Sequence, residues 1–99
     1  LGREAVRCAD ALQALTDRIV ATSAQDAALP YWVADDYLRA ASMALLAWAG
    51  ARIEASPAAA RPGARAALDA LMLWVLPEFD MRCAIIDRRL ASADVSSLA

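Results

Sequence analysis

The sequence contains no histidine and no lysine. Without histidine it lacks the commonest metal ligand in proteins and the usual general base near neutral pH. All ten basic residues are arginines, they are spread along the chain, and the formal net charge is −2. This distribution contains no basic patch, which argues against direct binding of nucleic acid. The sequence also has no Gly-rich phosphate loop and no dinucleotide-binding pattern.

Glycine, proline and cysteine are scarce as well. With three glycines, four prolines and no long run of β-branched residues, the sequence predicts an all-α fold without strands. Hydrophobic residues make up 61% of the 99 positions, but 27 of them are alanines. Alanine favours helix and fills little volume, so we expect closely approaching helices. Cys8 and Cys83 lack a C-x-x-C spacing and are expected to be buried free thiols.

Long apolar runs are also missing. The uncharged run over residues 40–51 is too short to span a bilayer, which requires about 20 residues. The first residues, Leu-Gly-Arg-Glu, carry charge at once and do not resemble a secretory signal. We therefore expect a cytoplasmic protein, with residues 1–99 forming one helical domain.

Apolar residues recur at helical spacing in three stretches, at about residues 3–24, 30–55 and 64–91. The connection at 56–63 contains two prolines and a glycine and is predicted to be a loop. These helices predict a three-helix up-down-up bundle, with 92–99 as a frayed tail. Pro77 lies inside the third helix, where it removes a backbone hydrogen bond and predicts a kink.

The second helix has apolar or small side chains on most of its circumference, so nearly all of it must be covered. One face carries larger side chains, and a second carries only small ones that let another helix approach closely. The larger set is Ala34, Tyr37, Leu38, Ala41, Leu45 and Trp48, and the small set is Ala40, Ala44, Ala47 and Ala51.

The third helix has a predicted core line and a second group of apolar residues away from it. The core line is Leu68, Met72, Val75, Phe79, Cys83, Ile86 and Leu90. The second group would form an exposed patch of the size that marks interaction sites, so we expect a partner to complete the bundle there, with Trp74 near the centre. The predicted interface residues are Leu73, Trp74, Leu76, Met81 and Ile85.

Few acidic residues are candidates for acid–base catalysis or metal binding. Glu78 lies among apolar neighbours, where a carboxylate can act as an acid or base, but an i,i+4 ion pair with Arg82 is the interpretation we favour. Asp35 and Asp36 are adjacent on a helix, point about 100° apart and cannot share a metal, so we interpret them as a solvated helix start. We assign no catalytic, cofactor-binding or metal-binding residue.

The predicted helix directions also decide whether Cys8 and Cys83 can form a disulfide. In an up-down-up bundle the first and third helices run parallel, with Cys8 near the start of one and Cys83 well along the other. Their axial separation is then roughly 20 Å at 1.5 Å per residue. A disulfide requires Cα atoms about 4.4–6.8 Å apart, so we predict that none forms.

Two stretches together resemble a known family. The first, residues 31–55, contains A-D-D-Y-L-R followed by a small-residue, Trp-containing helix, and the second, residues 71–90, contains V-L-P inside a helix. This order resembles the extra C-terminal helical domain of the larger bacterial acyl-CoA dehydrogenases, including the methylmercaptopropionyl-CoA dehydrogenase type. Ala41 and Ser42 replace the glycine that members often carry after Y-L-R.

The resemblance implies a non-catalytic packing and oligomerisation domain of a flavoenzyme. The family uses FAD to oxidise acyl-CoA thioesters, and its flavin site and glutamate base belong to the preceding domains. The expected partners are therefore a second copy of the chain or the dehydrogenase domains of the same protein, with FAD in the parent enzyme only.

Two other classes remain as alternatives. One is the ligand-binding or dimerisation module of a helical transcriptional regulator, although no helix-turn-helix segment is present. The other is a small helical chorismate mutase, whose motifs faintly match residues 86–90. That active site requires a lysine, which this sequence lacks.

Overall fold

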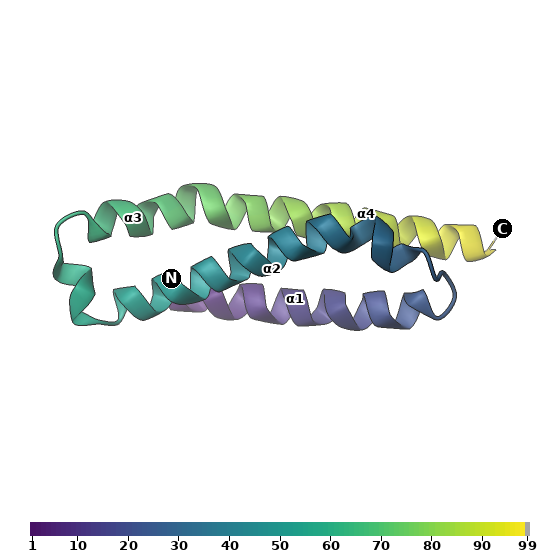
Figure 1. Ribbon diagram of the computed structural model, residues 1–99, viewed down its shortest axis with the longest axis horizontal. Coiled ribbons are helices and arrows are strands. Elements are labelled where there is room, and N and C mark those ends of the chain that lie inside the picture. Colours follow the sequence, from purple (N-terminus) through teal and green to yellow (C-terminus); the bar gives the residue numbers. More distant parts are fainter. Residues whose placement is uncertain (99) are drawn as a thin grey trace.

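The computed structural model describes the backbone of residues 1–98 and the side chains of residues 1–92. Over these residues the chain forms three long helical rods and no strand (Figure 1). The first two rods are α1 (Gly2–Ser23) and α2 (Leu29–Glu54). The third joins α3 (Ala64–Ala70), the π-helical turn η2 (Leu71–Val75) and α4 (Leu76–Leu98). A short 3-10 helix, η1 (Pro57–Ala60), lies in the second connection. The all-α three-helix bundle is thus confirmed.

The last helix is longer than the sequence predicts. Its backbone is helical to Leu98, whereas we expected it to end near residue 91. The predicted frayed tail, residues 92–99, is therefore helical as far as its backbone is described. The side chains of residues 93–99 and the backbone of Ala99 lie outside the described residues.

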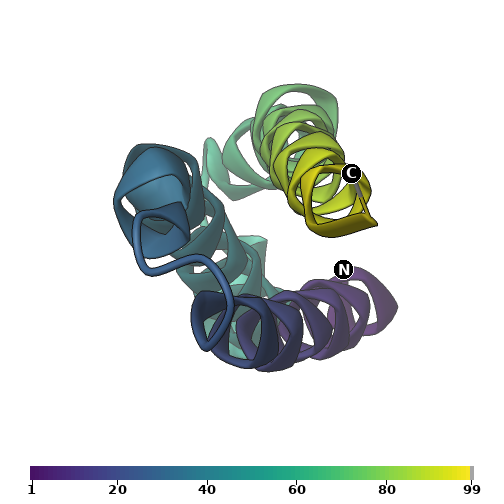
Figure 2. The same cartoon turned by 90° about the vertical axis from the view of Figure 1, so that its right-hand side faces the viewer.

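Ion pairs between helices show that α1 and α4 run parallel. Arg7 Nη1 lies 2.8 Å from Asp80 Oδ1, and further along both helices Arg18 pairs with Asp87. Viewed from the end of the bundle, α2 lies beside both of them (Figure 2). The predicted up-down-up directions are therefore present.

The register between α1 and the third rod differs from our expectation. Cys83 packs against the buried cluster that contains Cys8, so the two cysteines lie at neighbouring levels of the bundle. Both cysteines are free, as predicted, but the 20 Å separation offered as the reason is wrong. The third rod begins well before the start of α1, so α3 extends past the N-terminus (Figure 1).

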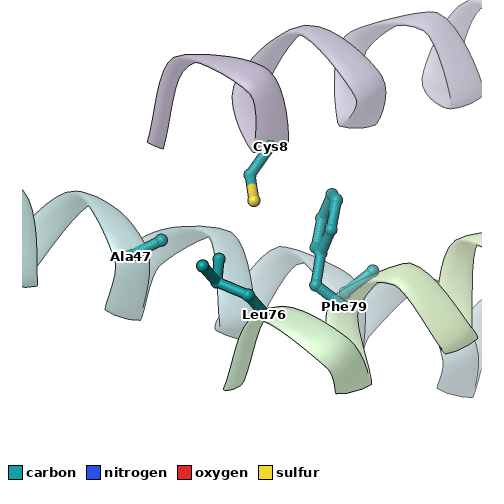
Figure 3. Close-up of a cluster of buried hydrophobic side chains, with 5 residues drawn as sticks. Cys8, Ala47, Leu76 and Phe79 are labelled. Atoms are coloured by element: carbon teal, nitrogen blue, oxygen red, sulfur yellow. The ribbon is translucent and has the colours of Figure 1, made fainter. Parts of the chain in front are cut away.

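Small side chains of α2 form the centre of the bundle. Ala40 and Ala47 are fully buried, in one cluster with Cys8, Leu76 and Phe79 (Figure 3). Close approach extends to Gly50, where an added Cβ would lie 2.7 Å from Leu1 Cδ2 and still nearer to Leu71 Cδ1. A second cluster fills the other end of the bundle and consists of Leu15, Leu29, Val33, Ile86 and Leu90.

The third rod changes its helical register just before Pro77. The Leu76 N–H donates to the Leu71 carbonyl five residues back, which makes this turn wider than an α-helical one. The extra residue rotates the core face, so Met72 is 44% exposed and Leu76, at 5%, is in the core. The predicted core line is thus wrong at Met72, and its other members are all buried or half-buried. The expected kink is present as a bend at this wide turn.

Burial also affects the two thiols. Desolvation raises the pKa of Cys8, and it raises the pKa of Cys83 to about 11. A thiol held in its protonated form is a poor nucleophile and a poor metal ligand. These cysteines therefore behave as small hydrophobic residues of the core.

We expect Ala47→Leu to lower the free energy of unfolding by about 1–3 kcal/mol, because no space exists for the larger side chain where the three helices meet. Thermal unfolding followed by circular dichroism measures this change. The exposed Ala84→Leu is the matched control, and its effect should stay within about 0.5 kcal/mol. Equal effects of the two substitutions would contradict the close packing of α2.

We expect the free energy of unfolding to fall as the pH rises from about 9 to about 11, because the unfolded chain loses the Cys83 proton first. Below this range both states hold the proton and the burial of the thiol contributes fully. Urea unfolding across this range measures the slope, and Cys83→Ala should make it shallower. An unchanged slope in that variant would show that Cys83 ionises equally in both states.

Candidate interaction surface

The acidic candidates pair with arginines between and within helices. Arg82 Nη1 lies 3.0 Å from Asp36 Oδ1, and Arg82 Nε lies 3.8 Å from Glu78 Oε2. The favoured Glu78–Arg82 pair is therefore present. The solvated position predicted for Asp36 is wrong, since its side chain is only 18% exposed and joins α2 to α4. Asp35 pairs with Arg39 on the surface of α2.

Other kinds of site have little support in the part of the chain that the structure describes. There, no group of three or more cysteine and carboxylate side chains is arranged to hold a metal ion. Likewise, none of the helices within residues 1–98 combines the length and apolar character that crossing a membrane requires. The surface is instead distinguished by its large exposed apolar side chains.

Four of the five predicted interface residues are accessible on the third rod. Trp74 is 75% exposed, Leu73 68% and Met81 47%, and Ile85 is half-buried. The fifth, Leu76, is a core residue, because the wide turn at Leu71–Val75 rotates it inward. We name the remaining set, Leu73, Trp74, Met81 and Ile85, the Trp74 surface.

A second apolar surface lies between α1 and α2, and our sequence reasoning did not predict it as a site. Two hollows there have volumes of about 430 and 630 Å³ and share Thr16 and Tyr37, so they adjoin on one face of the α1–α2 pair. We name the two hollows together the α1–α2 groove. Its largest exposed side chains are Val6, Val20, Leu38, Leu45 and Trp48. A seven-residue spacing in both helices is the signal that could have identified it.

The polar side chains in this groove are hydrogen-bonded within the chain. Thr16 Oγ1 lies 2.8 Å from the Leu12 carbonyl and 2.6 Å from the Tyr37 hydroxyl. Because threonine has one proton and donates it to the carbonyl, Tyr37 donates to Thr16. Gln13 Nε2 donates to Asp17 Oδ1 at 3.0 Å. None of the residues that line the groove is charged, so its chemistry suits an apolar partner.

The three tryptophans are all outside the core. Trp32, Trp48 and Trp74 are 64%, 54% and 75% exposed. Arg89 lies over the Trp32 ring and Arg52 over the Trp48 ring, at 5.4 and 5.1 Å from the ring centroids. Such contacts stabilise an exposed ring only slightly, by about 0.5–1 kcal/mol. Most of the apolar area of these rings stays in contact with water.

Comparisons of the chain with protein-family models, with curated proteins and with solved structures found no match. The resemblance to the C-terminal helical domain of acyl-CoA dehydrogenases therefore stays a prediction.

Proposed function

We propose that this chain is a non-catalytic helical packing and oligomerisation domain, and that the Trp74 surface is where it packs against a neighbouring folded domain. The observation that carries the proposal is the exposure of Trp74 and Leu73, at 75% and 68%. Removing apolar area from water stabilises a contact by roughly 25 cal/mol per Å². Tryptophan is among the residues that contribute most of the binding free energy at interfaces.

The neighbouring domain, in this proposal, is the flavin-containing body of an acyl-CoA dehydrogenase in the cytoplasm. The basis is the resemblance of residues 31–55 and 71–90 to the extra helical domain of that family. Both stretches belong to packed helices, the first to α2 and the second to η2 and α4. FAD and the catalytic base would belong to the dehydrogenase body, and these helices would stabilise the assembly.

A second candidate is the ligand-binding or dimerisation module of a helical transcriptional regulator. The apolar α1–α2 groove, with its volumes of about 430 and 630 Å³, is the observation that favours it. The two candidates differ in their cofactor, because a regulator of this kind would contain no flavin.

We expect the complete protein that contains this chain, purified without denaturation, to show the absorption spectrum of bound oxidised flavin. In that protein, Leu73→Ser with Trp74→Ser should weaken docking of the helical domain by about 2 kcal/mol or more, since both exposed side chains would be covered at the contact. Limited proteolysis, which releases an undocked domain faster, measures the effect.

The matched control for that experiment is Trp32→Ser with Leu46→Ser, which truncates the same two residue types at exposed positions of α2 outside the Trp74 surface and the α1–α2 groove. It should leave the rate of proteolytic release unchanged. Absence of flavin would remove the dehydrogenase assignment. Flavin together with equal release rates in all variants would remove the docking role of the Trp74 surface alone.

A further inference from the structure

The α1–α2 groove presents two rows of exposed side chains with a seven-residue repeat. On α2 the row consists of Leu38 and Leu45, which line the groove and are both 66% exposed, and Tyr31, 85% exposed, continues it beyond the groove lining. On α1 the row is Val6, Gln13 and Val20, in which the two valines are 61% and 65% exposed. A seven-residue apolar repeat is the pattern of helices that pack along their length against other helices. This spacing favours a helical partner for the face.

The width of the face indicates how many helices cover it. The groove is lined by both α1 and α2, which form an antiparallel pair and each contribute one of the two rows. A second antiparallel pair covers both rows and completes a four-helix bundle. A second copy of this chain supplies such a pair.

The surface is complementary to itself. Large side chains, including Leu38, Leu45 and Trp48, project from it, while the floor between them is lined by Ala9 and Ala41. When two copies face each other about a two-fold axis, projecting leucines of one meet the alanine-lined floor of the other. Such a contact places knobs into holes, as bundle cores do.

Burial of this face would leave few polar groups without partners. Thr16 donates to the Leu12 carbonyl, Tyr37 donates to Thr16, and Gln13 donates one of its two N–H groups to Asp17. The groove lining contains no charged side chain whose desolvation would oppose association. The remaining cost is the ordering of side chains at the contact.

The exposed apolar area of the groove reaches the lower limit for a specific dimer. Trp48, at 54% exposure, offers roughly 100 Å² if its ring can bury about 150–250 Å². The four exposed aliphatic side chains, Val6, Val20, Leu38 and Leu45, add roughly 100 Å² each. The sum is roughly 500 Å² for each copy and roughly 1,000 Å² for the pair, the area at which specific interfaces begin.

We propose that two copies of this chain associate face to face through the α1–α2 groove and form a four-helix layer from their α1–α2 pairs. This inference goes beyond the proposed function, because it uses a different face of the molecule and does not depend on a flavoenzyme. The Trp74 surface stays accessible in such a dimer, since it lies on the third rod.

Sedimentation equilibrium of the purified chain tests the dimer. The parent should sediment as a dimer, and Leu38→Arg with Leu45→Arg should raise its dissociation constant at least a hundredfold. Both leucines are 66% exposed, so the double variant should keep the helical content and the thermal midpoint of the dissociated parent. Leu73→Arg with Trp74→Arg places the same charges on the other surface and should leave the dimer intact.

A second variant covers the case in which the arginine substitutions disturb folding. Val6→Gln with Val20→Gln removes the apolar row of α1 without adding charge, and it should also weaken the dimer at least tenfold. A parent that stays monomeric at high concentration would overturn the proposal. So would a dimer that survives both groove variants, or one that dissociates only in the Trp74 variant. A dimeric parent whose complete protein lacks flavin would remove only the proposed dehydrogenase function.

Discussion

The small side chains on one stripe of α2 are the constraint on which the rest of this structure depends. Ala40 and Ala47 are fully buried, and an added Cβ at Gly50 would contact Leu1 and Leu71. Because this stripe occupies the centre of the bundle, larger residues of α2 such as Leu38, Leu45 and Trp48 cannot also lie there. They project outward, and so the molecule carries an extensive apolar surface despite its well-filled core.

The wide turn before Pro77 is the second constraint, because it decides which residues of the third rod are buried. Proline cannot donate the backbone hydrogen bond that an α-helix requires at its position, and its ring crowds the preceding turn. The π-helical turn at Leu71–Val75 changes the register there, which places Leu76 in the core and leaves Met72 partly exposed. The same rod carries Trp74 in the π-helical turn itself, so the exposed ring lies in a part of the helix with irregular geometry.

These two features together account for two of the apolar surfaces of the molecule. One is the Trp74 surface on the third rod, and the other is the groove between α1 and α2. A single partner domain at the Trp74 surface and a second copy at the groove can bind together, because the two surfaces involve different helices. A domain with this arrangement would connect one protomer to another while remaining attached to a larger body.

The sequence alone determined the three helices, the break between α2 and the third rod and the exposed Trp74, because helical periodicity and turn residues are local signals. It could not determine which face of α2 is buried, since α2 is apolar nearly all round and either face could form a core. Nor could it place Leu76 or the axial level of Cys83. These depend on the wide turn and on the Arg7–Asp80 contact, which appear only when the helices pack. The groove is likewise a property of two helices side by side, although each contributed a seven-residue repeat that the sequence already contained.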